Sequence, residues 1–117
     1  MKIKTFEDII AWQKAKTLTL TIYQRTTNLK DYSFKDQICR ASISIMNNIA
    51  EGFERQTDKE FIYYLHIAKG SSAEVRSMLH IARDLHYIDM SVYENLLQLS
   101  IETSKTISGL IKSLTKK

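Results

Sequence analysis

Residues 57–82 read TDKEFIYYLHIAKGSSAEVRSMLHIA, and this stretch predicts one long helix with a defined inward face. Small and apolar residues recur along it at alternating spacings of four and three. That period is typical of the inward seam of a left-handed helical bundle. Thr57 and Glu60 form a capping box, so the helix is expected to begin at Asp58. The predicted seam consists of Phe61, Leu65, Ala68, Ser72, Val75, Leu79 and Ala82.

Three further helices are expected on the same grounds. Each begins at a residue that accepts a hydrogen bond from a free backbone N–H group, with an acid three positions later. The predicted pairs are Thr5 with Asp8, Ser33 with Asp36, and Ser91 with Glu94. Gly52 is expected to end the second helix, because glycine tolerates the left-handed conformation that follows a helix. The predicted seam of the last helix is Tyr93, Leu97, Ser100, Ser104, Ile107, Ile111 and Leu114.

The expected helices cover about residues 6–28, 34–51, 58–86 and 92–114. Short links between long helices favour antiparallel neighbours. The chain has no proline and three glycines, which argues against a β-rich fold with its many turns. Residues 1–117 are therefore predicted to form a single all-α domain, an antiparallel up-down four-helix bundle.

The positive charge is concentrated at the carboxyl end. The net charge of +4 equals the four lysines that follow the last acid, Glu102, so residues 1–104 are net neutral. Composition alone therefore gives little support for nucleic-acid binding. A tail of Lys112, Lys116 and Lys117 is expected to add a flexible, unspecific contribution.

Catalytic, metal and cofactor sites are not expected. None of the three histidines has a partner in a Glu-x-x-His or His-x-x-x-His pair, and there is no glycine-rich phosphate loop. Cys39 is interpreted as a small core residue, and as the only cysteine it cannot form an internal disulfide. The sequence predicts a protein that is not an enzyme.

A cytoplasmic location without membrane contact is expected. The first eight residues contain no apolar signal region, and no apolar run approaches the ~20 residues that a membrane span needs.

Two of the predicted helices carry more apolar surface than one seam requires. The third has a second row of Ile67, Met78, Ile81 and Leu85, and the first has one of Ile9, Trp12, Leu20 and Tyr23. These rows either lie deep in the bundle or form a subunit interface, and we favour self-association. Gly70 costs ~1 kcal/mol relative to alanine within a helix, so it is expected to permit the close approach of another helix.

A basic row remains on the third predicted helix. It has no acid in it and consists of His66, Lys69, Arg76, His80 and Arg83. One interpretation is a solvated charged face, and the other is a ridge that contacts phosphates. No aromatic residue interrupts the row, so any RNA binding is expected to tolerate different sequences.

The junction after the second helix is the most unusual stretch. Adjacent asparagines are poor residues for a helix interior unless their amides satisfy other polar groups. Its notable residues are Asn47, Asn48, Glu51, Gly52 and Arg55, and Glu51 is expected to pair with Arg55. The junction is interpreted as a structural pin, with a ligand or RNA site as the alternative.

Residues 6–15 (FEDIIAWQKA), 37–55 (QICRASISIMNNIAEGFER) and 61–74, which end in GSSAE, resemble the 23S rRNA intervening-sequence protein family. The resemblance implies a four-helix bundle that commonly forms a ring-shaped homopentamer. Some members are encoded in insertions within bacterial 23S rRNA genes. The family also resembles the accessory variability determinant proteins of diversity-generating retroelements, which associate with a reverse transcriptase and nucleic acid. Met46 and Cys39 depart from the usual pattern, where proline and a basic residue are common.

Two functions are therefore weighed. The first is a homo-oligomeric accessory protein, pentameric as the resemblance implies, that binds RNA weakly or assists a nucleic-acid-processing protein. The alternative is an oligomeric scaffold for protein partners. Salt dependence distinguishes them, because phosphate contacts release counterions whereas apolar interfaces do not.

Overall fold

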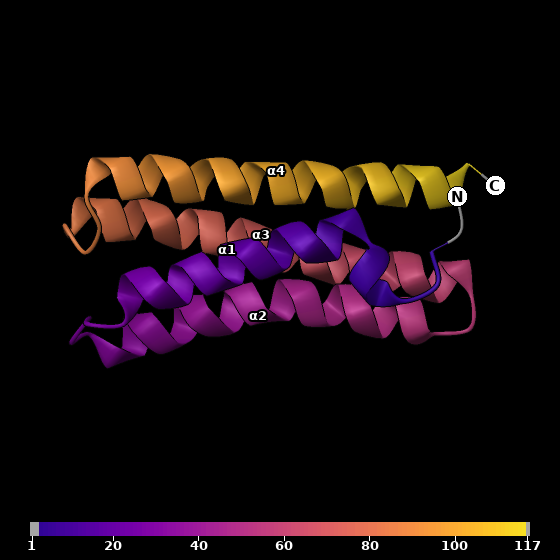
Figure 1. Cartoon of the computed structure of the whole chain (residues 1–117), viewed down its shortest axis with the longest axis horizontal. Helices are drawn as coiled ribbons and strands as arrows, with labels where there is room; N and C mark the ends of the chain where they lie inside the picture. The colour runs from indigo at the N-terminus through magenta and orange to yellow at the C-terminus, as the bar shows by residue number, and fades with distance from the viewer. Residues whose placement is uncertain (1–2, 117) are drawn as a thin grey trace.

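The computed structural model describes residues 3–116 and contains four long helices that run up and down beside one another (Figure 1). They are α1 (Ile10–Thr26), α2 (Tyr32–Glu54), α3 (Asp58–Asp84) and α4 (Met90–Thr115), preceded by the short 3₁₀ helix η1 (Phe6–Asp8). α2 packs against α1 and α3, and α4 packs against α3 and α1, so α1 and α3 stand at opposite corners. The predicted all-α four-helix bundle is confirmed.

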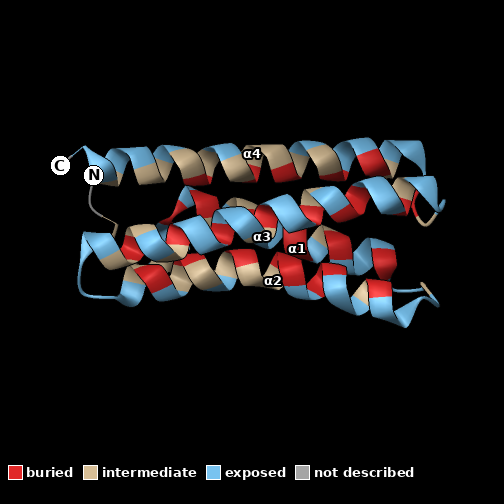
Figure 2. Ribbon diagram, turned by 180° about the vertical axis from the view of Figure 1, so that it is seen from behind, coloured by how far each residue is buried: buried red, intermediate tan, exposed pale blue. Residues whose placement is uncertain are grey.

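The core runs along the bundle axis, and Figure 2 shows the buried residues on the inward side of each helix. All seven residues of the predicted α3 seam are buried. The α4 prediction was partly wrong, because Leu96 and Thr103 are buried where Leu97 and Ser104 were expected. Leu97 instead lies half-buried at the edge of the core. None of the helices within residues 3–116 is long and apolar enough to cross a membrane.

The first helix does not run over 6–28 as predicted. Ile9 adopts an extended backbone (φ −78°, ψ 122°) and separates η1 from α1. Its side chain is buried, and Phe6 packs edge-on against Trp12 with ring centroids 5.2 Å apart. Burying these side chains bends the chain back over the bundle, so Thr5 makes no side-chain cap bond to a backbone N–H.

Two predicted helix starts were also wrong. α2 and α4 begin after Asp31 and Asp89, whose carboxylates accept hydrogen bonds from the backbone N–H groups of Phe34 and Val92. Ser33 lies inside α2 and Ser91 inside α4, so neither serves as the cap. Carboxylates are strong acceptors at the positive end of a helix, which explains why they take this role. The Thr57 cap of α3 is confirmed, since its hydroxyl accepts from the N–H of Glu60 at 3.1 Å.

Neither Gly52 nor Gly70 has the role that the sequence predicted. Gly52 does not end α2, which continues to Glu54; it is the point where α2 and α3 touch. A Cβ added at Gly52 would lie 2.7 Å from the Cβ of Tyr64 and 3.0 Å from the ring of Phe61. Gly70 was predicted to permit a close helix approach, yet a Cβ there would meet nothing within 4 Å. The reason is that Gly70 faces outward from the bundle.

At the opposite end of the bundle, Tyr87 connects the α3–α4 link to the α1–α2 link. Its hydroxyl donates to Asp31 at 2.7 Å, and its ring packs on Phe34. This hydrogen bond lowers the pKa of Asp31, as does the N–H of Phe34, and it raises the pKa of Tyr87. His86 turns the chain between α3 and α4 with a left-handed φ of 59°.

We predict that Gly52→Ala lowers the free energy of unfolding by about 1–3 kcal/mol, because the new methyl group overlaps the Cβ of Tyr64. Gly109→Ala is the matched control, since Gly109 is exposed within α4 and its added Cβ meets open space. The control should be more stable than the parent by roughly 0.5–1 kcal/mol. Urea unfolding at one fixed protein concentration measures both, and a Gly52→Ala protein as stable as the control would contradict the close contact.

Candidate nucleic-acid interface

The basic row lies on the flank of α3 that faces α4. Ser72 of the α3 seam donates to the carbonyl of Ser100 on α4, which sets the orientation of the two helices. The row residues follow the seam residues by one position, so they lie about 100° around the helix from it. His66, Lys69 and His80 are exposed, whereas Arg76 and Arg83 are partly covered.

Lys69 and Arg76 are the available cations of this row. In the described residues 3–116, the ion pairs involve Lys14, Arg55 and Arg83, and neither Lys69 nor Arg76 takes part in one. The acid Glu74 lies on the other flank of α3, where it accepts from Gln37 of α2 at 3.3 Å. Lys69 and Arg76 therefore present charge that no carboxylate within the described chain neutralises.

Arg83 was predicted to be part of the same ridge, but its guanidinium contacts other side chains of the same subunit. Its guanidinium lies 4.7 Å from the centroid of the Tyr93 ring and donates to the Tyr93 hydroxyl at 3.1 Å. It also pairs with Asp84 at 3.0 Å. Arg83 therefore joins α3 to α4, and its charge is only partly available to a ligand.

His80 shares the Tyr93 hydroxyl with Arg83. Its Nδ1 lies 3.3 Å from that oxygen, and the two rings meet edge-on at 5.8 Å. Because Arg83 donates to the hydroxyl, the hydroxyl hydrogen is free to be donated to an unprotonated Nδ1. The sequence pattern missed this cluster because Tyr93 belongs to another helix. His80 thus helps to hold the α3–α4 contact, whereas His66 has no such contact within residues 3–116.

Two further cations lie beside the row on α4. Lys105 and Lys112 are exposed and seven residues apart, which places them on one face of the helix. The opposite flank of α4 faces α1, as the pair between Lys14 and Glu102 shows. α4 continues to Thr115, so Lys112 belongs to a helix and not to a flexible tail as predicted. Lys116 caps that helix, and Lys117 lies outside the described residues.

The junction residues form a clamp between α2 and α3. Arg55 pairs with Glu51 at 3.5 Å, as predicted, and with Glu60 at 3.3 Å, while its guanidinium lies 5.2 Å from the ring centroid of Tyr64. Desolvation, and secondly a hydrogen bond to Glu51, raise the pKa of Tyr64. These contacts support the interpretation of the junction as a structural pin.

The two asparagines of the junction differ in their surroundings. The amide nitrogen of Asn48 donates to the carbonyl and the hydroxyl of Ser44, and that hydroxyl contacts Ser71 on α3. Asn48 therefore supports the α2–α3 contact. Asn47 is exposed on the outer face of α2 and lines a shallow hollow with Arg40 and Ile43.

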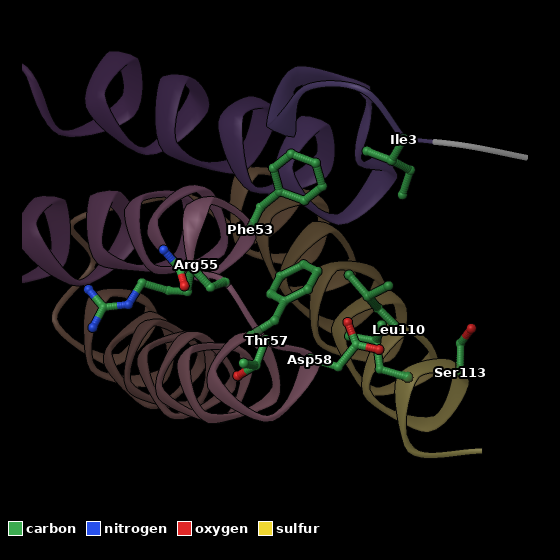
Figure 3. Close-up of a pocket in the computed structure, with 10 residues that line it drawn as sticks. Ile3, Phe53, Arg55, Thr57, Asp58, Leu110 and Ser113 are labelled. Atoms are coloured by element: carbon green, nitrogen blue, oxygen red, sulfur yellow. The ribbon is translucent and has the colours of Figure 1, made fainter. Parts of the chain in front are cut away.

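A cavity of about 500 Å³ lies at the end of the bundle where the α2–α3 link meets the end of α4 (Figure 3). Phe53, Leu110 and Ser113 surround it, and Arg55 extends away from Leu110 toward its clamp partners. Apolar and polar side chains both line the cavity. Within residues 3–116, no group of His, Cys, Asp and Glu is arranged to hold a metal ion.

Comparisons with known proteins agree with this fold. The model of the family described as 23S rRNA-intervening sequence protein matches residues 7–109. A crystal structure of a protein of unknown function from the S23 ribosomal protein family of Bacteroides thetaiotaomicron superposes with a TM-score of 0.82. It is 27% identical, and the match covers 88% of this chain and 99% of that one. No curated protein is similar enough to count as a relative.

The two partly covered arginines of the row should respond differently to substitution. Arg83→Gln removes the stacking and the charged hydrogen bond on Tyr93, so we expect the free energy of unfolding to fall by about 1–2 kcal/mol. Arg76→Gln serves as the control and should change it by less than roughly 0.5 kcal/mol, because Arg76 has no ion pair in the described chain. Thermal and urea unfolding measure both. Equal losses would show that the Tyr93 cluster does not stabilise the bundle.

Proposed function

The chain belongs to the 23S rRNA-intervening sequence protein family, and on that premise we propose that it is a non-enzymatic, self-associating helical bundle that binds RNA weakly through the basic flank of α3. The ring of five subunits that the sequence resemblance implies is part of the proposal, as is a cytoplasmic location. The observation that carries it is the pair of unneutralised cations Lys69 and Arg76, with Lys105 and Lys112 on the adjacent helix.

The chemistry of this surface suits phosphate contacts better than base recognition. Lys69 and Arg76 are seven residues apart, so they are separated by about 10 Å along α3. The row contains no Phe, Tyr or Trp, the side chains on which bases stack most readily. Binding should therefore depend on backbone charge and tolerate different sequences.

Self-association would make this weak surface effective. Each subunit offers few available cations, and each phosphate contact alone contributes little. In a closed assembly the flank is repeated around the ring, so a second contact by the same RNA becomes intramolecular and its effective concentration rises.

A protein scaffold is the second candidate function, and the exposed apolar side chains favour it. Of the second rows predicted on α1 and α3, Ile9 and Met78 are buried, while Leu20, Ile81 and Leu85 are 52%, 48% and 52% exposed. These side chains suit an apolar partner surface. Binding that does not change with salt would support this alternative.

We predict that Lys69→Gln combined with Arg76→Gln weakens RNA binding and flattens its salt dependence. Two phosphate contacts per subunit would be lost. The negative slope of the logarithm of the RNA association constant against the logarithm of the salt concentration should therefore become less steep by roughly 1–2. Arg83 is kept because of its contact with Tyr93. Fluorescence anisotropy with a labelled RNA of mixed sequence, between 50 and 200 mM salt as is usual for such titrations, measures the effect.

The matched control is Lys4→Gln combined with Lys30→Gln, which removes the same charge from exposed positions off the flank. This control should bind as the parent does, and circular dichroism should show equal helicity in all three proteins. If both double variants lose affinity equally, the effect is one of net charge and not of the basic flank. If the parent binds no RNA at low salt, the scaffold function replaces the proposal.

We also predict that the parent has a mass several times 13.6 kDa in light scattering at micromolar concentration. The exposed apolar side chains of α1 and α3 supply the driving force. A mass that stays at one subunit across a concentration series would contradict self-association.

A further inference from the structure

The cavity of about 500 Å³ at the end of the bundle is a consequence of the break before α1 (Figure 3). Ile10, the first residue of α1, and Thr106 of α4 line one hollow, so they are level along the bundle. α4 continues to Thr115, about 13 Å further, whereas the chain before Ile10 leaves the helix direction at the extended residue Ile9. The last turns of α4 therefore have no α1 helix beside them, and space remains between them and the α2–α3 link.

This cavity has an apolar floor and a polar mouth. The apolar lining is buried or half-buried and comes from Ile3, Phe53, Phe61, Leu110 and Leu114. The polar lining is exposed and includes Asp58 and Ser113. Pockets for small molecules have volumes of roughly 300–1,000 Å³, so the size is suitable. The division suits a ligand with an apolar body in the interior and a polar group at the mouth.

The charge at the mouth favours a cation. The charged side chains in the described lining are Arg55 and Asp58. The guanidinium of Arg55 is held by its two glutamate partners and by the Tyr64 ring, and Figure 3 shows it turned away from Leu110. Asp58, in contrast, extends toward Leu110 in the same view. A ligand that enters between α3 and α4 therefore meets a carboxylate and not the guanidinium.

An aromatic ring stands next to this carboxylate. Phe61 follows Asp58 by three residues in α3, so the two side chains lie on one face of the helix. Phe53 of α2 meets Phe61 edge-on, with ring centroids 5.9 Å apart. Aromatic faces attract cations, and a carboxylate accepts strong hydrogen bonds from an ammonium group. Together these groups favour an ammonium over a neutral or anionic head group.

We propose that this cavity binds a small organic amine. Its ammonium group lies by Asp58 and the Phe61 ring, and its apolar body packs against Phe53 and Leu110. The site lies about three turns along α3 from Lys69, the nearest available cation of the basic flank. The amine site therefore goes beyond the proposed function and does not depend on RNA binding.

A second hollow gives the apolar body room to extend. It has a volume of about 220 Å³ and shares Ile3 and Leu110 with the first cavity. Apolar residues at the start of α1 supply most of its remaining wall, and Asp8 lies at its edge. An alkyl chain whose ammonium group lies at Asp58 can therefore run past Ile3 toward this hollow.

Calorimetric titration of the full chain with octylammonium, octanol and octanoate tests the head group. Each probe has the same chain length and is used below the concentration at which it aggregates. Octylammonium should bind most tightly and octanoate least tightly, because Asp58 attracts the one and repels the other. Asp58→Asn should weaken octylammonium binding roughly two- to fivefold and leave octanol binding unchanged. Asp8→Asn is the matched control, since it removes a carboxylate from the other hollow, and should change neither.

Filling the cavity tests the location. Ser113→Trp places an indole at the mouth from an exposed position of α4, so it should abolish the binding of all three probes. Asn95→Trp, at an exposed position near the start of α4, should bind as the parent does. Circular dichroism should show equal helicity in both variants. In NMR spectra of the parent, octylammonium should shift the methyl signals of Ile3 and Leu110.

Three results would overturn the proposed amine site. They are a parent that binds no probe at millimolar concentration, octanoate that binds as tightly as octylammonium, and an Asp8→Asn variant that loses as much affinity as Asp58→Asn. Binding that Ser113→Trp leaves unchanged, or methyl shifts away from Ile3 and Leu110, would place the ligand elsewhere and overturn it too. None of these results changes the expectations for RNA binding or self-association.

Discussion

The contact of α2 with α3 at Gly52 is the constraint on which the rest of the surface depends. A side chain there would overlap Tyr64, so the two helices can meet only because the residue is glycine. Around this point Arg55 holds Glu51 and Glu60, and further along Ser44 meets Ser71. These contacts set the rotation of α3 about its own axis. That rotation directs its seam inward, its basic flank toward α4 and the exposed side chains of Ile67 and Ile81 away from the core.

The parts of the fold that depend on local periodicity could be predicted from the sequence. The α3 seam follows from spacing alone, and all its residues are buried. The helix starts were less predictable, because Asp31 and Ser33 are both good caps and only the backbone path decides between them. The break at Ile9 depends on tertiary packing, since burying that side chain outweighs the continuation of the helix. The end of α2 was misplaced for a similar reason, as a glycine can serve either a terminus or a close contact.

In the candidate site, too, some features follow from local spacing and others depend on tertiary contacts. The basic row could be predicted from helical spacing, and within residues 3–116 neither Lys69 nor Arg76 takes part in an ion pair. Arg83 could not be assigned in this way, because its partner Tyr93 is ten residues away on another helix. Periodicity reports which face of a helix a residue occupies, but it does not report what the neighbouring helix presents to that face. For the same reason the close helix contact was assigned to Gly70, whereas the surroundings of the two residues show that it lies at Gly52.

Assembly and nucleic-acid binding are coupled in the proposed function by simple linkage. One subunit offers two unneutralised cations on α3 and two nearby on α4, which is too few for appreciable affinity at physiological salt. In the proposed ring these cations are repeated, so RNA that spans several subunits would bind the ring more tightly than it binds the separated subunits. A ligand that prefers one state stabilises that state, and therefore RNA should in turn favour the ring. The exposed apolar side chains and the basic flank, although they lie on different parts of the surface, then act on one equilibrium.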